Sequence, residues 1–298
     1  MRVFLTGATG FIGSKIVPEL LGAGHQVLGL TRSDKGADAL AAQGADVHRG
    51  DIEDLDSLRR GVEGADAVVH TAFDHDFSNF VANCEKDRRV IEAMGEVLVG
   101  SAHPFLITSG VGIGLRTPGQ PAAEEYFDRD NPNPRKASEE AGQAVAAKGV
   151  DVRVVRLSQI HDPEKQGLIS PLIDVFREKK AVAYVGDGAN RFAACPVLDT
   201  AHLYRLVLEK GAAGGVYNAV QEEGVPMREI AETIAHGMGV PARSVAPDDV
   251  KEFFGWMSMF AGIDIVASSA ITRERLGWNP TGSGLISDLE AMDYGKTA

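Results

Sequence analysis

Three regularly spaced glycines follow a short apolar run at the start of the chain. The run Arg2 to Thr6 reads RVFLT, and Gly7, Gly10 and Gly13 come after it. Such glycines permit a tight turn off a strand, close approach of backbone to a pyrophosphate, and close packing of the next helix. The N-terminus of that helix then faces the phosphates. The spacing predicts a site for a dinucleotide, although a glycine-rich turn can also serve a purely structural end.

The next β-type run, Gln26 to Arg32, ends in residues that bear on which dinucleotide is bound. An acidic residue at such a strand end accepts from the ribose 2′-hydroxyl of NAD and repels the extra phosphate of NADP. Here the residues are Thr31, Arg32 and Ser33. Arg32 can pair with a 2′-phosphate, and Ser33 can donate a hydrogen bond. We expect NADP(H), while Asp34 leaves NAD(H) possible and Arg32 could instead be a solvated loop charge.

Short β-type runs alternate with helical segments over the first half of the chain and must position these residues. The runs are Arg2 to Thr6, Gln26 to Arg32, Ala45 to Asp51, Ala65 to Ala72, Pro104 to Gly110 and Asp151 to Ile160. Such alternation is typical of a parallel sheet with helical crossovers. The predicted fold class is α/β, a Rossmann-type doubly wound parallel sheet with a smaller C-terminal substrate lobe.

The alternation breaks after Ile160, where segments rich in Gly and Pro follow, and a further β-type run appears near Val216 to Val220. We expect an NADP(H)-binding domain over 1–160, to which 191–220 returns, and a substrate-binding lobe made of 161–190 and 221–298. In that lobe an apolar cluster crowds too few positions for one helix face: Phe253, Phe254, Trp256, Met257, Met259 and Phe260. A plain core explains it, but if some members line the site, the substrate is apolar or aromatic.

Composition excludes several classes of protein. The 298 residues are 44% hydrophobic, which suffices for a core, and the net charge of -12 argues against nucleic acid or an anionic membrane as partner. Cys84 and Cys195 lie far apart, so neither a disulfide scaffold nor a metal site is expected. We expect no signal peptide and no spanning helix, because no long apolar run occurs. A cytoplasmic monomer or homodimer acting on a small molecule fits these features.

Seven segments, by their order and spacing, resemble the extended short-chain dehydrogenase/reductase superfamily, which includes NAD-dependent epimerases and dehydratases. They are TGATGFIG at 6–13, GDIEDLDSL at 50–58, ADAVVHTA at 65–72, FLITSG at 105–110, VRVVRL at 152–157, YVGDGANRF at 184–192 and TRERLGWNPT at 272–281. The resemblance covers nearly the whole chain. It implies a Rossmann sheet that binds the dinucleotide, with the substrate held under the C-terminal lobe.

The resemblance also implies which residues contact the cofactor. Asp51 and Ile52 would touch adenine, and His70, Thr71 and Ala72 would lie along the nicotinamide half. His70 could equally be a packing residue at the end of a buried strand. The glycine loop would contribute Gly7, Thr9, Gly10, Phe11, Ile12 and Gly13.

The catalytic residues depart from the family pattern. Most members carry a Ser or Thr after the fifth strand, and Thr108 and Ser109 match it; Ser109 can hydrogen-bond a substrate carbonyl or merely satisfy loop backbone. Members also carry a YxxxK helix, in which Tyr donates the proton and Lys lowers its pKa and holds the ribose. The matching segment, NPNPRKASEEAG at 131–142, has no tyrosine, and it places Arg135 at the Tyr position and Glu139 at the Lys position.

These substitutions change what the site can do. A guanidinium is a poor proton donor, so Arg135 would polarise a carbonyl or hold a carboxylate. Glu139 can accept from both ribose hydroxyls, or it can pair with Arg135 at helical i, i+4 spacing. Tyr126, 17 residues after Ser109, is the nearest tyrosine that could supply the acid, or it is an ordinary half-buried aromatic.

The sequence therefore predicts an NADP(H)-dependent oxidoreductase that passes hydride to or from a small organic carbonyl, enone or imine. One alternative is a nucleotide-sugar epimerase or dehydratase, for which the missing YxxxK is an obstacle. Cys195 and Pro196, where many relatives have Val-His, weaken it further. Another alternative is a catalytically silent NADP(H)-binding sensor or scaffold. Ser109 favours an enzyme, because a sensor needs no hydroxyl there.

Overall fold

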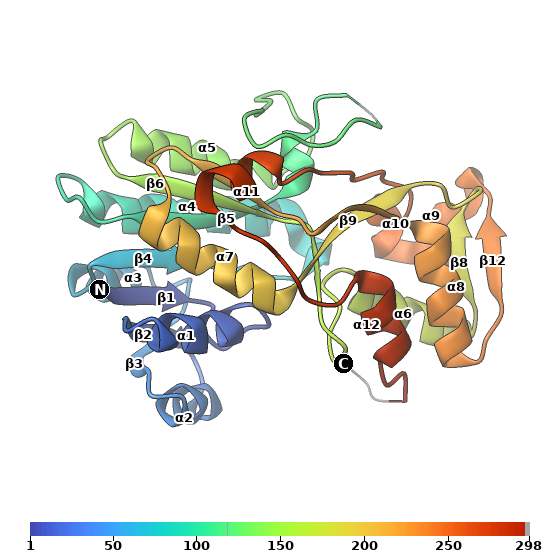
Figure 1. Cartoon of the computed structure of the whole chain (residues 1–298), viewed down its shortest axis with the longest axis horizontal. Helices are drawn as coiled ribbons and strands as arrows, with labels where there is room; N and C mark the ends of the chain where they lie inside the picture. The colour runs from blue at the N-terminus through green and yellow to red at the C-terminus, as the bar shows by residue number, and fades with distance from the viewer. Residues whose placement is uncertain (118, 296–298) are drawn as a thin grey trace.

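Seven parallel strands form the main sheet of the computed structural model, in which residues 1–117 and 119–295 are described (Figure 1). The strands lie in the order β10-β6-β5-β4-β1-β2-β3, and every neighbouring pair is parallel. All the carboxyl ends therefore meet at one edge of the sheet. The strands are β1 (Arg2–Thr6), β2 (Gln26–Thr31), β3 (Asp46–Arg49), β4 (Ala67–His70), β5 (Phe105–Gly110), β6 (Val152–Leu157) and β10 (Val216–Ala219).

Helices cover both faces of this sheet, so its central strands are buried on both sides and consist mainly of Val, Ile, Leu and Phe. One face carries α1 (Gly13–Gly22) and α7 (Val197–Lys210), which pack against each other. The other face carries α3 (Leu55–Glu63), α4 (Phe80–Leu98) and α5 (Lys136–Ala146). The short helix α2 (Asp34–Ala42) connects β2 to β3. This is the doubly wound arrangement predicted from the sequence.

A second lobe with its own apolar core stands beyond the carboxyl edge of the sheet, at the right of Figure 1. Its strands are β7 (Gln159–His161), β9 (Arg191–Pro196) and β11 (Glu222–Pro226) in one small sheet, and β8 (Val182–Val185) and β12 (Ala242–Val245) in another. Its helices are α6 (Ile169–Lys179), α8 (Met227–Met238), α9 (Val250–Phe254), α10 (Ser258–Ala261) and α12 (Leu285–Ala291).

The structure confirms the α/β class. It differs from the sequence prediction at two boundaries between the large lobe and the second lobe. The run predicted as one strand from Asp151 to Ile160 is two strands, because the chain leaves the large sheet after Leu157 and β7 pairs with β9 of the second lobe. Near the C-terminus, α11 (Ala270–Leu276) packs on β10 and α7, and Trp278 is buried in the core of the large lobe. The second lobe therefore includes β9 but not the segment 270–278.

Both cysteines, Cys84 and Cys195, are buried free thiols. Burial raises the pKa of Cys84 to about 11 and that of Cys195 to about 12, so neither is a reactive thiolate. Within the described residues, no group of His, Cys, Asp or Glu side chains could hold a metal ion. No helix in this part of the chain is both long and apolar enough to cross a membrane.

Candidate functional site

One large cavity, of about 1450 Å³, lies between the carboxyl edge of the main sheet and the second lobe. Its wall begins at the loop after β1, follows the ends of β4, β5 and β6, and reaches α6 and α10. Pockets for a single small ligand usually enclose roughly 300–1,000 Å³. The cavity therefore has room for a dinucleotide and a second molecule side by side.

The glycine loop lines one end of this cavity and has no space for side chains. Gly7 has a φ of +71°, and a Cβ on Gly13 would lie 2.0 Å from the Gly7 carbonyl oxygen. No described side chain caps the start of α1, and its first turn has no acidic residue, so its free N–H groups suit an anion. The loop therefore fits the diphosphate of a dinucleotide. The predicted loop residues that line the cavity are Gly7, Thr9, Gly10, Phe11, Ile12 and Gly13.

The ends of β2 and β3 extend the same part of the cavity. Arg32, Asp51 and Ile52 all line it, and Arg32 Nη1 lies 3.5 Å from Asp51 Oδ2. The Arg32 side chain is 79% exposed, so it can turn from this loose pair toward another anion. Ser33 does not line the cavity, because its hydroxyl oxygen accepts from the Gly36 N–H at 3.1 Å and caps α2.

The residues at the end of β4 lie partly on the cavity wall and partly in the protein interior. Thr71 and Ala72 line the cavity, whereas His70 does not and is 1% exposed. The His70 Nδ1 lies 2.6 Å from Thr6 Oγ1, and its Nε2 lies 2.9 Å from Asp87 Oδ1. The alternative interpretation of His70, as a residue held inside the fold, is the one that this geometry supports.

Asp87, in the middle of α4, connects this interior to the cavity wall. Besides its contact with His70, its carboxylate accepts from Arg135 Nη1 at 2.6 Å and from Ser138 Oγ at 2.5 Å. Burial opposes ionisation of Asp87, but the charge of Arg135 and the contact with His70 outweigh it and lower the pKa well below its usual range. Asp87 is therefore a buried carboxylate that neutralises Arg135.

Arg135 lies just before α5 and lines the cavity. Its guanidinium also donates to the Ser138 hydroxyl and, through Nη2, to the Thr108 carbonyl oxygen at 2.9 Å. It rests 4.2 Å from the centroid of the Phe73 ring. These contacts hold the guanidinium at the end of β5, and the ion pair with Glu139 that the sequence allowed is not formed.

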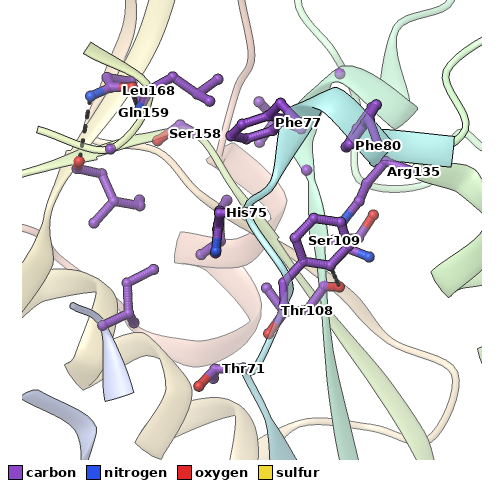
Figure 2. Close-up of a pocket in the computed structure, with 18 of the residues that line it drawn as sticks. Thr71, His75, Phe77, Phe80, Thr108, Ser109, Arg135, Ser158, Gln159 and Leu168 are labelled. Atoms are coloured by element: carbon purple, nitrogen blue, oxygen red, sulfur yellow. Dashed lines mark hydrogen bonds between the residues drawn. The ribbon is translucent and has the colours of Figure 1, made fainter. Parts of the chain in front are cut away.

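Ser109 is a buried hydroxyl without a partner. It ends β5, is 2% exposed, and its Oγ makes no hydrogen bond within the described part of the chain. It lines the cavity beside Arg135 (Figure 2). By contrast, the Thr108 hydroxyl donates to the His70 carbonyl oxygen at 2.7 Å and lies 2.6 Å from the Tyr204 hydroxyl, so it is used inside the fold. Of the two hydroxyls, only that of Ser109 has no hydrogen-bond partner within the described residues.

Glu139 and Tyr126 do not line this cavity but a second pocket, of about 380 Å³, beside β6 and α5. Both carboxylate oxygens of Glu139 accept from the buried Arg156 guanidinium at 2.8 Å. Arg156 also donates to the Tyr126 carbonyl oxygen at 2.9 Å. Because an unpaired buried guanidinium is costly, Arg156 holds Glu139 at the second pocket. The structure therefore brings neither the expected ribose ligand nor the expected acid to Ser109.

Four aromatic side chains, here called the aromatic wall, close the far side of the cavity: Phe77, Phe80, Trp256 and Phe260. Phe77 stacks on Trp256 with ring centroids 5.2 Å apart and an interplanar angle of 12°, and Phe260 meets Phe77 edge-on at 5.5 Å. Two of these four come from the cluster noted in the second lobe. The members of that cluster buried in the lobe core are Phe253, Phe254 and Met257.

Two residues of the site were not singled out from the sequence, Asp87 and His75, and Ser138 served there only to align Arg135 and Glu139 with the family pattern. Asp87 and Ser138 meet because α4 and α5 pack together, so the position of Asp87 along the chain gave no signal. His75 lines the cavity from the segment between β4 and the 3₁₀ turn Phe77–Asn79. The aromatic residues around it, in FDHDFSNF at 73–80, are the one signal that could have marked a segment facing an apolar site.

The parallel sheet, the glycine loop and the cavity at the strand ends define a dinucleotide-binding enzyme of the Rossmann class. The chain belongs to the NAD dependent epimerase/dehydratase family, whose model matches residues 3–219.

Relatives of this chain include reductases and epimerases. An uncharacterized protein of Schizosaccharomyces pombe is 43% identical over 295 residues, 99% of this chain and 100% of the relative. The 2-alkyl-3-oxoalkanoate reductase of Stenotrophomonas maltophilia is 28% identical over 268 residues, 81% of this chain and 77% of the relative. The structure of UDP-glucose 4-epimerase from Thermus thermophilus in complex with NAD has a TM-score of 0.78 at 20% identity and covers 100% of both chains, which shows a shared fold.

Proposed function

We propose that the protein is an NADP(H)-dependent oxidoreductase that transfers hydride to or from a small, neutral organic carbonyl, enone or imine. The observation that carries the proposal is the Ser109 hydroxyl, 2% exposed and without a partner in the described structure. A buried polar group left unsatisfied costs about 1–3 kcal/mol, and a substrate oxygen in the cavity would accept its hydrogen bond. A protein that only binds a dinucleotide gains nothing from such a group.

Arg135 supports a neutral carbonyl rather than a carboxylate. Because Asp87 already balances its charge, the pair adds no net positive charge for an anionic substrate. The remaining N–H groups of the planar guanidinium can still donate to an oxygen on which negative charge develops. Arg135 and Ser109 would together polarise the carbonyl, while Arg135 keeps its own proton.

The dinucleotide would lie between the glycine loop and the end of β4. Bound NADPH supplies the hydride and its electron pair for the new C–H bond. Gly7 to Gly13 would hold the diphosphate, and Asp51 the adenine. Arg32 would pair with the 2′-phosphate, since a loose contact with Asp51 at 3.5 Å is the only ion pair it makes in the described chain.

The aromatic wall favours a substrate with an apolar group. Phe192 and Ala193 of β9 also line the cavity and add further apolar surface to it. Arg191, the neighbouring cation, is bound to Asp264, with Nη2 2.8 Å from Oδ2. Strand β9 therefore presents apolar side chains to the substrate, and its arginine is already paired.

A nucleotide-sugar epimerase or dehydratase is the second candidate. Arg116 and Lys165 line the cavity, and neither forms an ion pair within the described residues. Two such cations could bind the diphosphate of a sugar nucleotide. This candidate therefore depends on Arg116 and Lys165, whereas the oxidoreductase depends on Ser109 and the aromatic wall.

The cofactor assignment is tested by calorimetric titration with NADPH and NADH. A charge-assisted contact with the 2′-phosphate should make NADPH bind about 10- to 100-fold more tightly, and Arg32→Ala should remove that preference. The matched control is Arg49→Ala, because Arg49 is exposed nearby, pairs with Asp34 and does not line the cavity. Equal affinities in the unmodified protein would reassign the cofactor as NAD(H).

The reaction is tested by NADPH oxidation with neutral ketones such as 4-phenylbutan-2-one. UDP-glucose and dTDP-glucose are incubated with the protein and NAD⁺, and their products are analysed directly, because epimerisation and dehydration consume no net NADPH. We expect turnover of a ketone, and Ser109→Ala should lower kcat by about 10²-fold without changing NADPH affinity. Turnover of a nucleotide sugar, lost in Arg116→Ala, would establish the second candidate instead. Tight NADPH binding without turnover of either class would mean a silent dinucleotide-binding protein.

A further inference from the structure

The cavity lacks an ordinary proton donor at the place where the substrate oxygen would lie. No tyrosine and no cysteine line its described wall. Lys86 is tied to Asp74 at 2.8 Å and Glu53 at 2.6 Å, and these contacts raise its pKa. Lysines ordinarily release a proton only near pH 10, and carboxylates ordinarily hold none near neutral pH. A different side chain must therefore supply the proton.

We infer that His75 is the general acid of this enzyme and donates the proton to the substrate oxygen held by Ser109 and Arg135. The inference rests on the proposed oxidoreductase function and adds to it a catalytic residue. His75 is the only histidine in the described wall of the cavity. Histidine is also the side chain that most often performs general acid catalysis near neutral pH.

The position of His75 fits this role. Figure 2 shows it within the cavity, between Thr71 and Phe77 in the view, with Ser109 and Arg135 to one side. Its ring meets Phe73 edge-on at 5.4 Å, and Phe73 carries the Arg135 guanidinium on its face at 4.2 Å. The His75 imidazole and the Arg135 guanidinium thus both contact the Phe73 ring, which places both near the end of β5.

The ring nitrogens of His75 are not occupied by other side chains. Within the described residues its imidazole forms no ion pair and no hydrogen bond to a side chain, and the residue is exposed and lines the cavity. A ring nitrogen can therefore carry the proton to be transferred and can recover it from solvent.

The charges around His75 make it a stronger acid than a free histidine. Partial desolvation lowers the pKa of His75 below its ordinary value, and the nearby cations Arg135 and Lys165 lower it further. The Phe73 carbonyl and Asp74 act in the opposite direction without outweighing them. The imidazolium form is therefore a minority at pH 7, but it transfers its proton readily to a developing alkoxide.

The proton from His75 goes to the oxygen of the substrate carbonyl. As the carbonyl carbon accepts hydride, the carbonyl oxygen gains the electron pair of the C=O π bond. An N–H bond of the His75 imidazolium breaks and an O–H bond forms on that oxygen. The hydride would leave a C–H bond of the reduced dinucleotide, so the products are an alcohol, the oxidised dinucleotide and a neutral imidazole, which takes up a proton from water. Reduction should therefore slow as pH rises through the pKa of His75.

The first test follows the His75 imidazole in the dinucleotide-free protein. Histidine labelled with ¹³C gives a resonance for each ring, and the signal missing from His75→Asn belongs to His75. We expect it to titrate with a midpoint below 6.5, and to shift when 4-phenylbutan-2-one is added. The signal of His236, which is exposed and does not line the cavity, is the matched control and should not move. A His75 signal that ignores the ketone would overturn the inference, whether or not the protein is active.

The second test uses the pH profile of kcat/KM for ketone reduction. The fall with rising pH should share its midpoint with the His75 resonance, since kcat/KM reports the free enzyme. His75→Asn, and independently His75→Gln, should lower kcat/KM by about 10²- to 10⁴-fold and flatten the profile, with NADPH affinity unchanged. Activity with an unaltered profile in both variants would assign the acid elsewhere and leave the oxidoreductase standing. If the unmodified protein reduces no ketone, the proposed function fails and the catalytic role of His75 fails with it; a ketone-induced shift would then show only that the ketone binds beside His75.

Discussion

Asp87 fixes the polar side of the cavity. Its side chain is 3% exposed, and it accepts from His70, Arg135 and Ser138 at once. An arginine beside a substrate is useful only if it keeps one orientation, because its long side chain otherwise has many rotamers. Asp87 supplies that orientation and also removes the net charge that would attract an anion.

Replacing this carboxylate should destabilise the fold. Removing one partner of a buried ion pair costs about 3–5 kcal/mol, so Asp87→Asn should lower the free energy of unfolding by roughly that amount at pH 7. Urea denaturation followed by circular dichroism measures it. Glu232→Gln is the control, because its pair with Arg228 lies on the surface and should contribute nothing measurable. Equal unfolding midpoints for Asp87→Asn and the unmodified protein would show that Arg135 does not need Asp87.

The same residue gives a pH signature of known sign. The pKa of Asp87 is lower in the folded protein than the roughly 3.9 of an unfolded aspartate. Its stabilising effect is therefore complete above about pH 4 and is lost as pH falls toward the folded value. The stability difference between the unmodified protein and Asp87→Asn should be constant from pH 7 to about 5 and shrink below about 4. A difference that grows in acid would contradict this assignment.

At the scale of elements, α5 separates two sites. Its N-terminal end presents Arg135 to the cavity, while Glu139, one turn later, binds Arg156 of β6 on the side of the second pocket. Glu139→Gln should therefore leave NADPH affinity unchanged and lower thermal stability, because Arg156 loses its charged partner. Calorimetry and a melting curve measure both. The control is Glu140→Gln, whose residue pairs with Arg88 in a more exposed position. Weaker NADPH binding in Glu139→Gln alone would return Glu139 to the ribose.

Elements were predictable where local sequence determines them. The run RVFLT and the glycines after it gave β1 and the glycine loop in their observed places, because strand burial and backbone space are local properties. The partners of Glu139 and His70 were not predictable in the same way. Glu139 pairs with Arg156 of β6, and His70 contacts Asp87 of α4. Both partners are buried charged residues on elements distant in the chain. Helical spacing alone therefore placed Glu139 and Arg135 together, although tertiary partners draw them apart.

At the scale of the whole molecule, the aromatic wall joins the two lobes across the cavity. Phe77 and Phe80 come from the segment after β4, whereas Trp256 and Phe260 come from the second lobe. Each lobe has its own core, so these rings are a contact that can open without unfolding either part. A substrate that enters between the lobes would then exchange ring-to-ring contacts for contacts with its own apolar group.

This exchange predicts a selective effect of Trp256. An aromatic contact contributes about 0.5–1.5 kcal/mol, so Trp256→Ala should raise KM for 4-phenylbutan-2-one by about 2- to 12-fold. NADPH affinity should not change, because the glycine loop lies at the other end of the cavity. Met259→Ala is the matched control: Met259 is 47% exposed, beside the 44% exposed Trp256, but it does not line the cavity, so its removal should leave KM unaltered.

The other tryptophan, Trp278, is 1% exposed, and changes in tryptophan emission on adding the ketone should therefore disappear in Trp256→Phe. An emission change that persists in that variant, or a KM that rises equally in Met259→Ala, would place the ketone away from the aromatic wall.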